Sequence, residues 1–92
     1  MLEVHTRART EFVPLSDRIR SEAAGLLASS GVLHLYVPHT TAGICVNEGF
    51  VGTSTLVPVR NSKLRLGRWQ EIFFCEFDGP RHRTVELTFL PG

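Results

Sequence analysis

Apolar and polar positions alternate at the start of the chain. Between Leu2 and Phe12 every second residue is apolar or a threonine, and every residue between these is charged or a histidine. A period of two places one set on a buried face and the other in solvent. Pro14 then interrupts the pattern, because proline cannot donate to a strand ladder. The pattern therefore predicts a half-buried strand over residues 2–12.

A different spacing follows and predicts a helix. Ser16 and Asp17 are residue types that commonly begin a helix. The apolar residues behind them share one helical stripe and are Ile19, Ala23, Leu26 and Leu27. Gly31 is expected to end the helix, since glycine favours the backbone conformation found at helix ends.

The rest of the chain is predicted to be mainly strand. The expected strands span 32–37, 44–47, 53–59, 69–77 and 84–90, with polar turns at 60–63 and 78–80. One helix in the N-terminal half and about six strands make an α+β fold with a mainly antiparallel, sandwich-like sheet. At 92 residues the chain is expected to form a single domain over residues 1–92.

Phe73 and Phe74 are adjacent and so point to opposite faces of the strand expected at 69–77. Both faces of that strand therefore need apolar cover. Two arrangements meet this requirement, namely a two-layer sandwich within one chain or a second subunit on the outer face.

Composition and charge narrow the class of protein. A hydrophobic content of 42% with 21% charged residues is typical of a globular chain. The net charge of +1 gives no reason to expect nucleic acid as a partner. No leader or membrane-length apolar run is visible, so we expect a cytoplasmic protein with no membrane partner. Cys45 and Cys75 have apolar neighbours and are expected to be buried, reduced thiols without a recognisable function.

The run from His39 to Glu48 is the first candidate for chemistry. It places an imidazole, two hydroxyls, an amide and a carboxylate behind an apolar strand. His39 is a candidate proton carrier or metal ligand, and the alternative is a histidine that caps the strand end. Glu48 is a candidate general base, and Asn47 could orient a ligand near His39. The alternative for both is a polar strand end that enters a turn.

A second group of residues is suited to an anion. The expected ligand-binding residues are Thr40, Thr41, Asn47, Gln70, Glu76, Arg81 and Arg83. Threonine hydroxyls and backbone N–H groups can bind phosphate, and a guanidinium group binds it with two parallel hydrogen bonds. An equally weighted alternative is that Arg81 forms an ion pair with Asp78 or Glu76.

The order of several motifs resembles the YjbQ-like family, also called the secondary thiamine-phosphate synthase family. The matching segments are 37–43, Asn47-Glu48, 52–54, 58–59, 63–64, 66–72 and 76–83. Each segment is weakly diagnostic, but the ordered set is specific and spans most of the chain.

The resemblance implies an enzyme that joins a pyrimidine-methyl pyrophosphate to a thiazole phosphate. Such a transferase needs to clamp the leaving pyrophosphate. It also implies a homotrimer, a phosphorylated small molecule as ligand, His39 as a site histidine, and a divalent metal ion such as zinc or magnesium. The natural substrate is expected to be another phosphorylated compound. The alternative is a non-catalytic, oligomeric binding or assembly protein.

One departure from the family pattern lies between Phe50 and Val51. Proteins of the family carry several tens of additional residues there, with a helix, a His-x-Glu-Gly-Asn motif and an Asp-x-His motif. A metal on His39 would thus need ligands from that segment or from another subunit. Either the protein has lost the segment, or the segment belongs to the protein and is missing from this sequence.

Overall fold

The computed structural model describes residues 1–47 and 49–92. The elements in chain order are β1 (Leu2–His5), β2 (Glu11–Pro14), α1 (Ser16–Ala23), β3 (Ser30–Tyr36), β4 (Ala42–Val46), β5 (Ser54–Arg60), β6 (Lys63–Leu64), β7 (Ile72–Glu76) and β8 (His82–Pro91). The predicted α+β fold with one helix and mainly antiparallel strands is confirmed.

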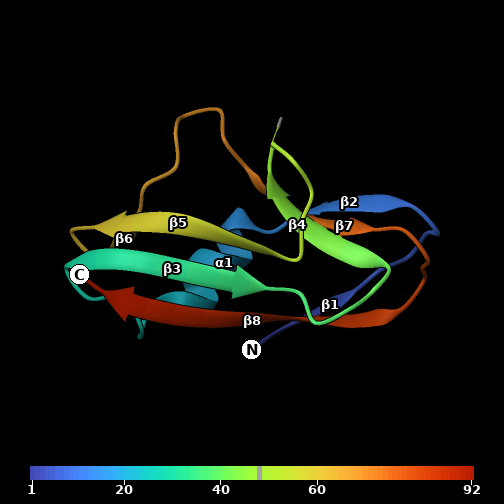
Figure 1. The fold of residues 1–92 in the computed structure, drawn as a ribbon, viewed down its shortest axis with the longest axis horizontal. Coiled ribbons are helices and arrows are strands. Elements are labelled where there is room, and N and C mark those ends of the chain that lie inside the picture. Colours follow the sequence, from blue (N-terminus) through green and yellow to red (C-terminus); the bar gives the residue numbers. More distant parts are fainter. Residues whose placement is uncertain (48) are drawn as a thin grey trace.

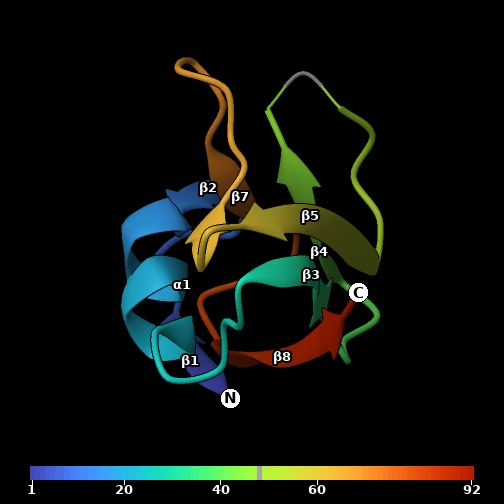
Figure 2. The same ribbon diagram turned by 90° about the vertical axis from the view of Figure 1, so that its left-hand side faces the viewer.

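The strands form two antiparallel sheets (Figure 1). One sheet has the order β1-β8-β3-β5-β6 and the other has the order β2-β7-β4. Figure 2 shows α1 along one side of the two sheets. The core between these layers includes the buried side chains of Ile19, Leu35, Ile44 and Phe74. Burial of a side chain the size of phenylalanine contributes about 1.5–3 kcal/mol, so this small core depends on a few large residues.

The strand predicted over residues 2–12 is divided between the two sheets. β1 pairs with β8, whereas β2 pairs with β7. The crossing segment is held by other loops, since the Thr6 N–H donates to the Arg81 oxygen and the Arg9 oxygen accepts from the Gly79 N–H. The prediction of one continuous strand is therefore wrong. Alternation continues across the break, so the pattern alone could not reveal the change of sheet.

The helix begins and ends differently from the prediction. Leu15 is the N-cap residue, and no side chain caps the helix from that position. The helix ends at Ala23, before two of the predicted stripe residues. Gly31 lies inside β3 at φ +153°, where a Cβ atom would collide with the backbone oxygen of Leu90. Gly31 therefore permits close approach of β8 rather than ending the helix.

The two faces of β7 have different environments. Phe74 is fully buried on the inner face, whereas Phe73 and Cys75 lie on the outer face. On that outer face Phe12 of β2 is 59% exposed. The chain by itself thus covers the inner face well and the outer face incompletely. Within the described ranges no helix is long and apolar enough to cross a membrane.

Candidate functional site

Three connections meet at one end of the molecule, on the right-hand side of Figure 1. They are residues 6–10 between β1 and β2, residues 37–41 between β3 and β4, and residues 77–81 between β7 and β8. The Thr41 oxygen accepts from the Phe77 N–H at 3.0 Å, which joins two of them. Most of the predicted site residues lie at this end, which we call the loop end.

Glu76 is the centre of the loop end. Its side chain is fully buried on the inner face of β7. The carboxylate accepts four hydrogen bonds: from Arg83 Nε at 2.9 Å, Arg83 Nη2 at 2.5 Å, Thr6 Oγ1 at 2.7 Å and the Asp78 N–H at 3.1 Å. The Arg83 hydrogen bonds are the main reason that the pKa of Glu76 falls to about 2. Glu76 is therefore a carboxylate at neutral pH.

Arg83 extends this network to the connection between β3 and β4, which contains Thr41. Its side chain is 6% exposed, and Nη2 also donates to Thr41 Oγ1 at 2.7 Å. Thr6 Oγ1 in turn accepts from the Arg81 N–H at 2.8 Å. A buried ion pair with these additional partners ties both sheets together, because β7 and β8 belong to different sheets. Arg83 thus has its charge neutralised inside the protein.

His39 lies half-buried at the same end. Its Nε2 accepts a hydrogen bond from the Thr84 backbone N–H at 3.0 Å. An acceptor at Nε2 requires the neutral tautomer with the proton on Nδ1. Burial, followed by the nearby Arg83 charge, lowers the pKa of His39. β3 has ended at Tyr36, so His39 fills the hydrogen-bonding position beyond the end of that strand.

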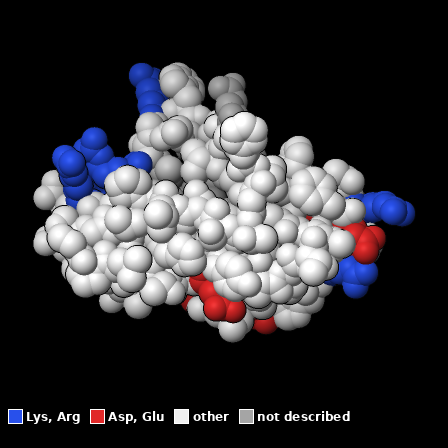
Figure 3. All heavy atoms as spheres, in the orientation of Figure 1, with Lys and Arg blue, Asp and Glu red and all other residues white. Residues whose placement is uncertain are grey.

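Arg81 has a more exposed position than Arg83. Its side chain is 54% exposed, with Nε on the Asp78 backbone oxygen at 2.8 Å and Nη2 on Asp78 Oδ2 at 3.0 Å. Thr40 is exposed in the neighbouring connection. In Figure 3 basic and acidic atoms lie beside each other at the right-hand end. The ion-pair alternative for Arg81 is thus realised with Asp78, whereas the pair between Arg83 and Glu76 was not predicted.

Asn47 and Gln70 lie elsewhere. Asn47 follows the far end of β4, about 15 Å along the strand from the loop end. Its Oδ1 accepts from the Glu71 N–H at 2.8 Å and its Nδ2 donates to the Trp69 oxygen at 2.9 Å. Gln70 Oε1 accepts from the Gly67 N–H at 2.7 Å in the same loop. The prediction that Asn47 lies near His39 is wrong, and Glu48 lies outside the described residues.

Several polar contacts were not predicted from the sequence. Glu71 Oε2 accepts from the Ser16 N–H at 2.9 Å, and Ser16 Oγ accepts from the Ile72 N–H at 2.9 Å. These two bonds fix the start of α1 against β7. Thr6 was foreseeable as a buried polar group, because it occupies an inward position of the alternating N-terminal pattern.

The sequence predicted His39 as a ligand for a divalent metal ion at the loop end. Nε2 of His39 is occupied by the Thr84 N–H, and Glu76 is saturated by hydrogen bonds. In residues 1–47 and 49–92 no three His, Cys, Asp or Glu side chains are grouped as a metal site would require. A zinc site needs at least three protein ligands, so the described residues alone do not fit this ion.

The chain matches the family model described as "UPF0047 protein YjbQ-like" over residues 1–50 and 49–92. It is 31% identical to the UPF0047 protein YugU of Bacillus subtilis, over 97% of this chain and 96% of that protein. It is 30% identical to a UPF0047 protein of Methanocaldococcus jannaschii, over 88% and 86% of the two chains. The chain therefore belongs to the YjbQ-like UPF0047 family.

The fold is shared with solved structures. A hypothetical protein from Aeropyrum pernix has a TM-score of 0.91 at 28% identity, over 99% of this chain and 96% of that one. An uncharacterised YjbQ/UPF0047 protein from Clostridium acetobutylicum has a TM-score of 0.89 at 26% identity, over 97% and 98%. These likenesses establish the architecture and leave the activity open.

The match also locates where this chain is shorter. The alignment with YugU extends over 127 residues, whereas this chain has 92, so at least 35 positions have no counterpart here. The two parts of the family match meet at residues 49–50. The additional residues of the relatives therefore enter directly after β4, at the far end of that strand from His39.

Proposed function

We propose that this chain binds a phosphorylated small molecule at the loop end without catalysing its transfer. One observation carries the proposal, namely the contrast between the two arginines. Arg83 is buried and committed to Glu76, whereas Arg81 keeps more than half of its side chain in solvent. Arg83 therefore stabilises the loop end, whereas the Arg81 guanidinium group can bind an anion.

The geometry favours binding over turnover. The Nε2 lone pair of His39 is committed to the Thr84 N–H, which limits its use as a base or as a metal ligand. The Glu76 carboxylate is likewise saturated and buried. The groups with free capacity at the loop end include the Arg81 side chain, the Thr40 hydroxyl and the exposed side chains of Arg7 and Arg9. Because Asp78 competes for Arg81, the affinity for phosphate is expected to be weak.

Replacing Arg81 with alanine tests this proposal. We expect Arg81→Ala to weaken binding of inorganic pyrophosphate about tenfold or more, since a charge-assisted hydrogen bond is worth about 1.5–3 kcal/mol. Isothermal titration at low ionic strength measures the change. An intact mass of 10.3 kDa should first establish that the protein used has no additional segment.

Arg20 provides a matched control for Arg81. It forms the same kind of exposed i,i+3 pair, with Nη1 at 3.0 Å from Asp17 Oδ1, but on the helix. Arg20→Ala should leave the pyrophosphate isotherm unchanged. Equal weakening in both variants would indicate binding by overall charge and would contradict the proposed site.

Transfer chemistry of the thiamine-phosphate synthase type is the second candidate. It is favoured by the meeting of His39, Thr40, Thr41 and Arg81 at one end. Incubation with a pyrimidine-methyl pyrophosphate and a thiazole phosphate distinguishes the two functions. If the wild type catalyses the transfer and His39→Ala does not, the protein is an enzyme and the binding proposal is wrong. Binding of these compounds without turnover would support the binding proposal.

Self-association is part of the same proposal. The incompletely covered outer face of β2-β7-β4, with Phe12 and Phe77 exposed, suits contact with another copy. We expect a homotrimer, with a mass three times the 10.3 kDa of the chain by light scattering. A monomer at micromolar concentration would contradict this expectation. Such an assembly would also be the source of the further ligands that a zinc or magnesium ion on His39 requires.

A further inference from the structure

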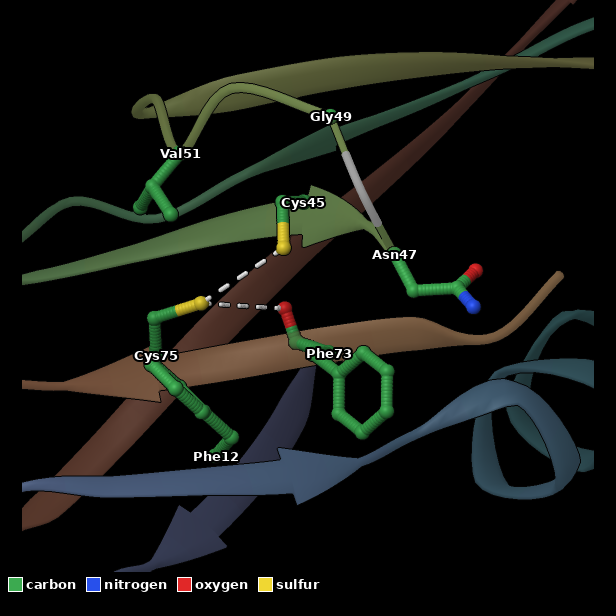
Figure 4. A pocket seen from close by; sticks show the side chains of 7 residues that line it. All are labelled: Phe12, Cys45, Asn47, Gly49, Val51, Phe73 and Cys75. Atoms are coloured by element: carbon green, nitrogen blue, oxygen red, sulfur yellow. Dashed lines mark hydrogen bonds between the residues drawn. The ribbon is translucent and has the colours of Figure 1, made fainter.

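Two cysteines from distant parts of the sequence lie side by side on the outer face of the smaller sheet. The sulfur atoms of Cys45 in β4 and Cys75 in β7 are 3.8 Å apart, and both are free thiols (Figure 4). In the register of the two strands Cys75 stands opposite Gly43, and Cys45 stands opposite Phe73. The space beside Gly43, where a side chain would lie, is filled by Val51 and the backbone of Gly52.

The two sulfurs line a pocket of about 270 Å³. The pocket residues are Phe12, Cys45, Asn47, Gly49, Val51, Phe73 and Cys75. The amide of Asn47 is occupied by its bonds to Trp69 and Glu71. Among the described lining side chains, the thiols are thus the polar groups with capacity for a ligand.

The strand geometry disfavours a disulfide between these thiols. Diagonal neighbours on antiparallel strands have Cα atoms about 7–8 Å apart, whereas disulfides span about 4.4–6.8 Å. Burial and the hydrogen bond to Cys45 raise the pKa of Cys75 to about 12. Because metal ions bind the thiolate, a metal ion at Cys75 must displace this proton.

The same geometry suits a metal ion bound between the sulfurs. Two thiolates at about 2.3 Å from a metal, with a tetrahedral angle between them, are about 3.8 Å apart. A three-coordinate ion with an angle of about 120° would separate them by about 4.0 Å, so the observed 3.8 Å needs only a small movement of the side chains. Zinc would need two more ligands, which the described pocket residues do not supply. Soft ions such as Cu(I) are selected by thiolates.

We propose that Cys45 and Cys75 together bind one soft, thiophilic metal ion of the Cu(I) class, with a remaining coordination position that faces the pocket. Binding releases two protons to solvent, one from each thiol, and forms two metal–sulfur bonds with no change of oxidation state. The pocket leaves space beside the ion for one further donor atom.

An anaerobic competition with bicinchoninate, a coloured Cu(I) ligand, tests the site. The wild-type chain should withdraw one Cu(I) per molecule from the coloured complex. The single variants Cys45→Ser and Cys75→Ser should each bind at least tenfold more weakly, because one thiolate is removed. Equal withdrawal by wild type and by the double serine variant would overturn the proposal.

Histidine side chains are an alternative binding site for copper. The His5 and His82 rings are exposed and stacked, with centroids 4.2 Å apart. The control variant His5→Ala should therefore retain full Cu(I) binding, and loss of binding in it would place the copper on histidine.

A measurement on the wild type covers the case in which serine variants do not fold. X-ray absorption of the copper-loaded protein should show sulfur atoms as the nearest neighbours of the metal. A shell of nitrogen and oxygen atoms alone would overturn the proposal.

Discussion

Arg83→Met is expected to lower the free energy of unfolding by about 3–5 kcal/mol, because it leaves the buried Glu76 carboxylate without its charged partner. Glu76 is fully buried, and Arg83 supplies two of its four hydrogen bonds. Small domains have a total stability of about 5–15 kcal/mol, so this change is a large part of the whole. Urea denaturation at pH 7 gives the value, and thermal unfolding serves if the variant is too unstable for an extrapolation.

The matched comparison is Arg81→Met at the exposed pair. Arg81 and Asp78 are joined at 3.0 Å with both side chains partly in solvent, so this change should cost less than about 1 kcal/mol. The double variant Glu76→Gln/Arg83→Met should recover much of the lost stability, since no unpaired charge remains. Similar losses for Arg81→Met and Arg83→Met would show that burial of the Glu76 pair has no special effect.

The sequence predicted local structure well where one face of an element is buried. The opposite orientations of Phe73 and Phe74 and the polar turn at 60–63 are confirmed, with Asn61 and Ser62 at positive φ. The division of the first strand was missed, because it depends on which partner each half finds. The partner of β1 is about 80 residues away in sequence and the partner of β2 about 60 residues away, and alternation carries no information on partner choice.

Only part of the candidate site could be predicted from the sequence. His39 and Thr41 were recognised as polar groups behind a strand, and the ion-pair alternative for Arg81 is what the structure contains. The participation of Thr6 and the proximity of Cys45 to Cys75 were missed. Both depend on register between strands far apart in sequence, which no local pattern specifies. Asn47 was wrongly predicted to lie near His39, because the two residues are close in sequence but lie at opposite ends of β4 in the structure.

Stability is expected to fall in acid by about 3 kcal/mol through Glu76 alone. Its pKa is about 2 in the folded protein against an ordinary value of 4.5, so the folded state holds its proton less tightly than the unfolded chain. The stabilisation that ionised Glu76 gives the folded state is therefore complete above about pH 4.5, and it is lost as the pH falls from there to about 2. Urea denaturation at several pH values in this window measures the slope.

Two variants separate this effect from the general acid response. The pKa of His39 is also lowered on folding, so its contribution is lost as the pH falls below the ordinary histidine value of 6.5, before Glu76 begins to titrate. His39→Ala should therefore flatten the upper part of the curve only. Glu76→Gln, which cannot ionise at this position, should flatten the part below pH 4.5. An unchanged slope there in Glu76→Gln would assign the acid sensitivity to other carboxylates and would contradict the role given to the buried ion pair.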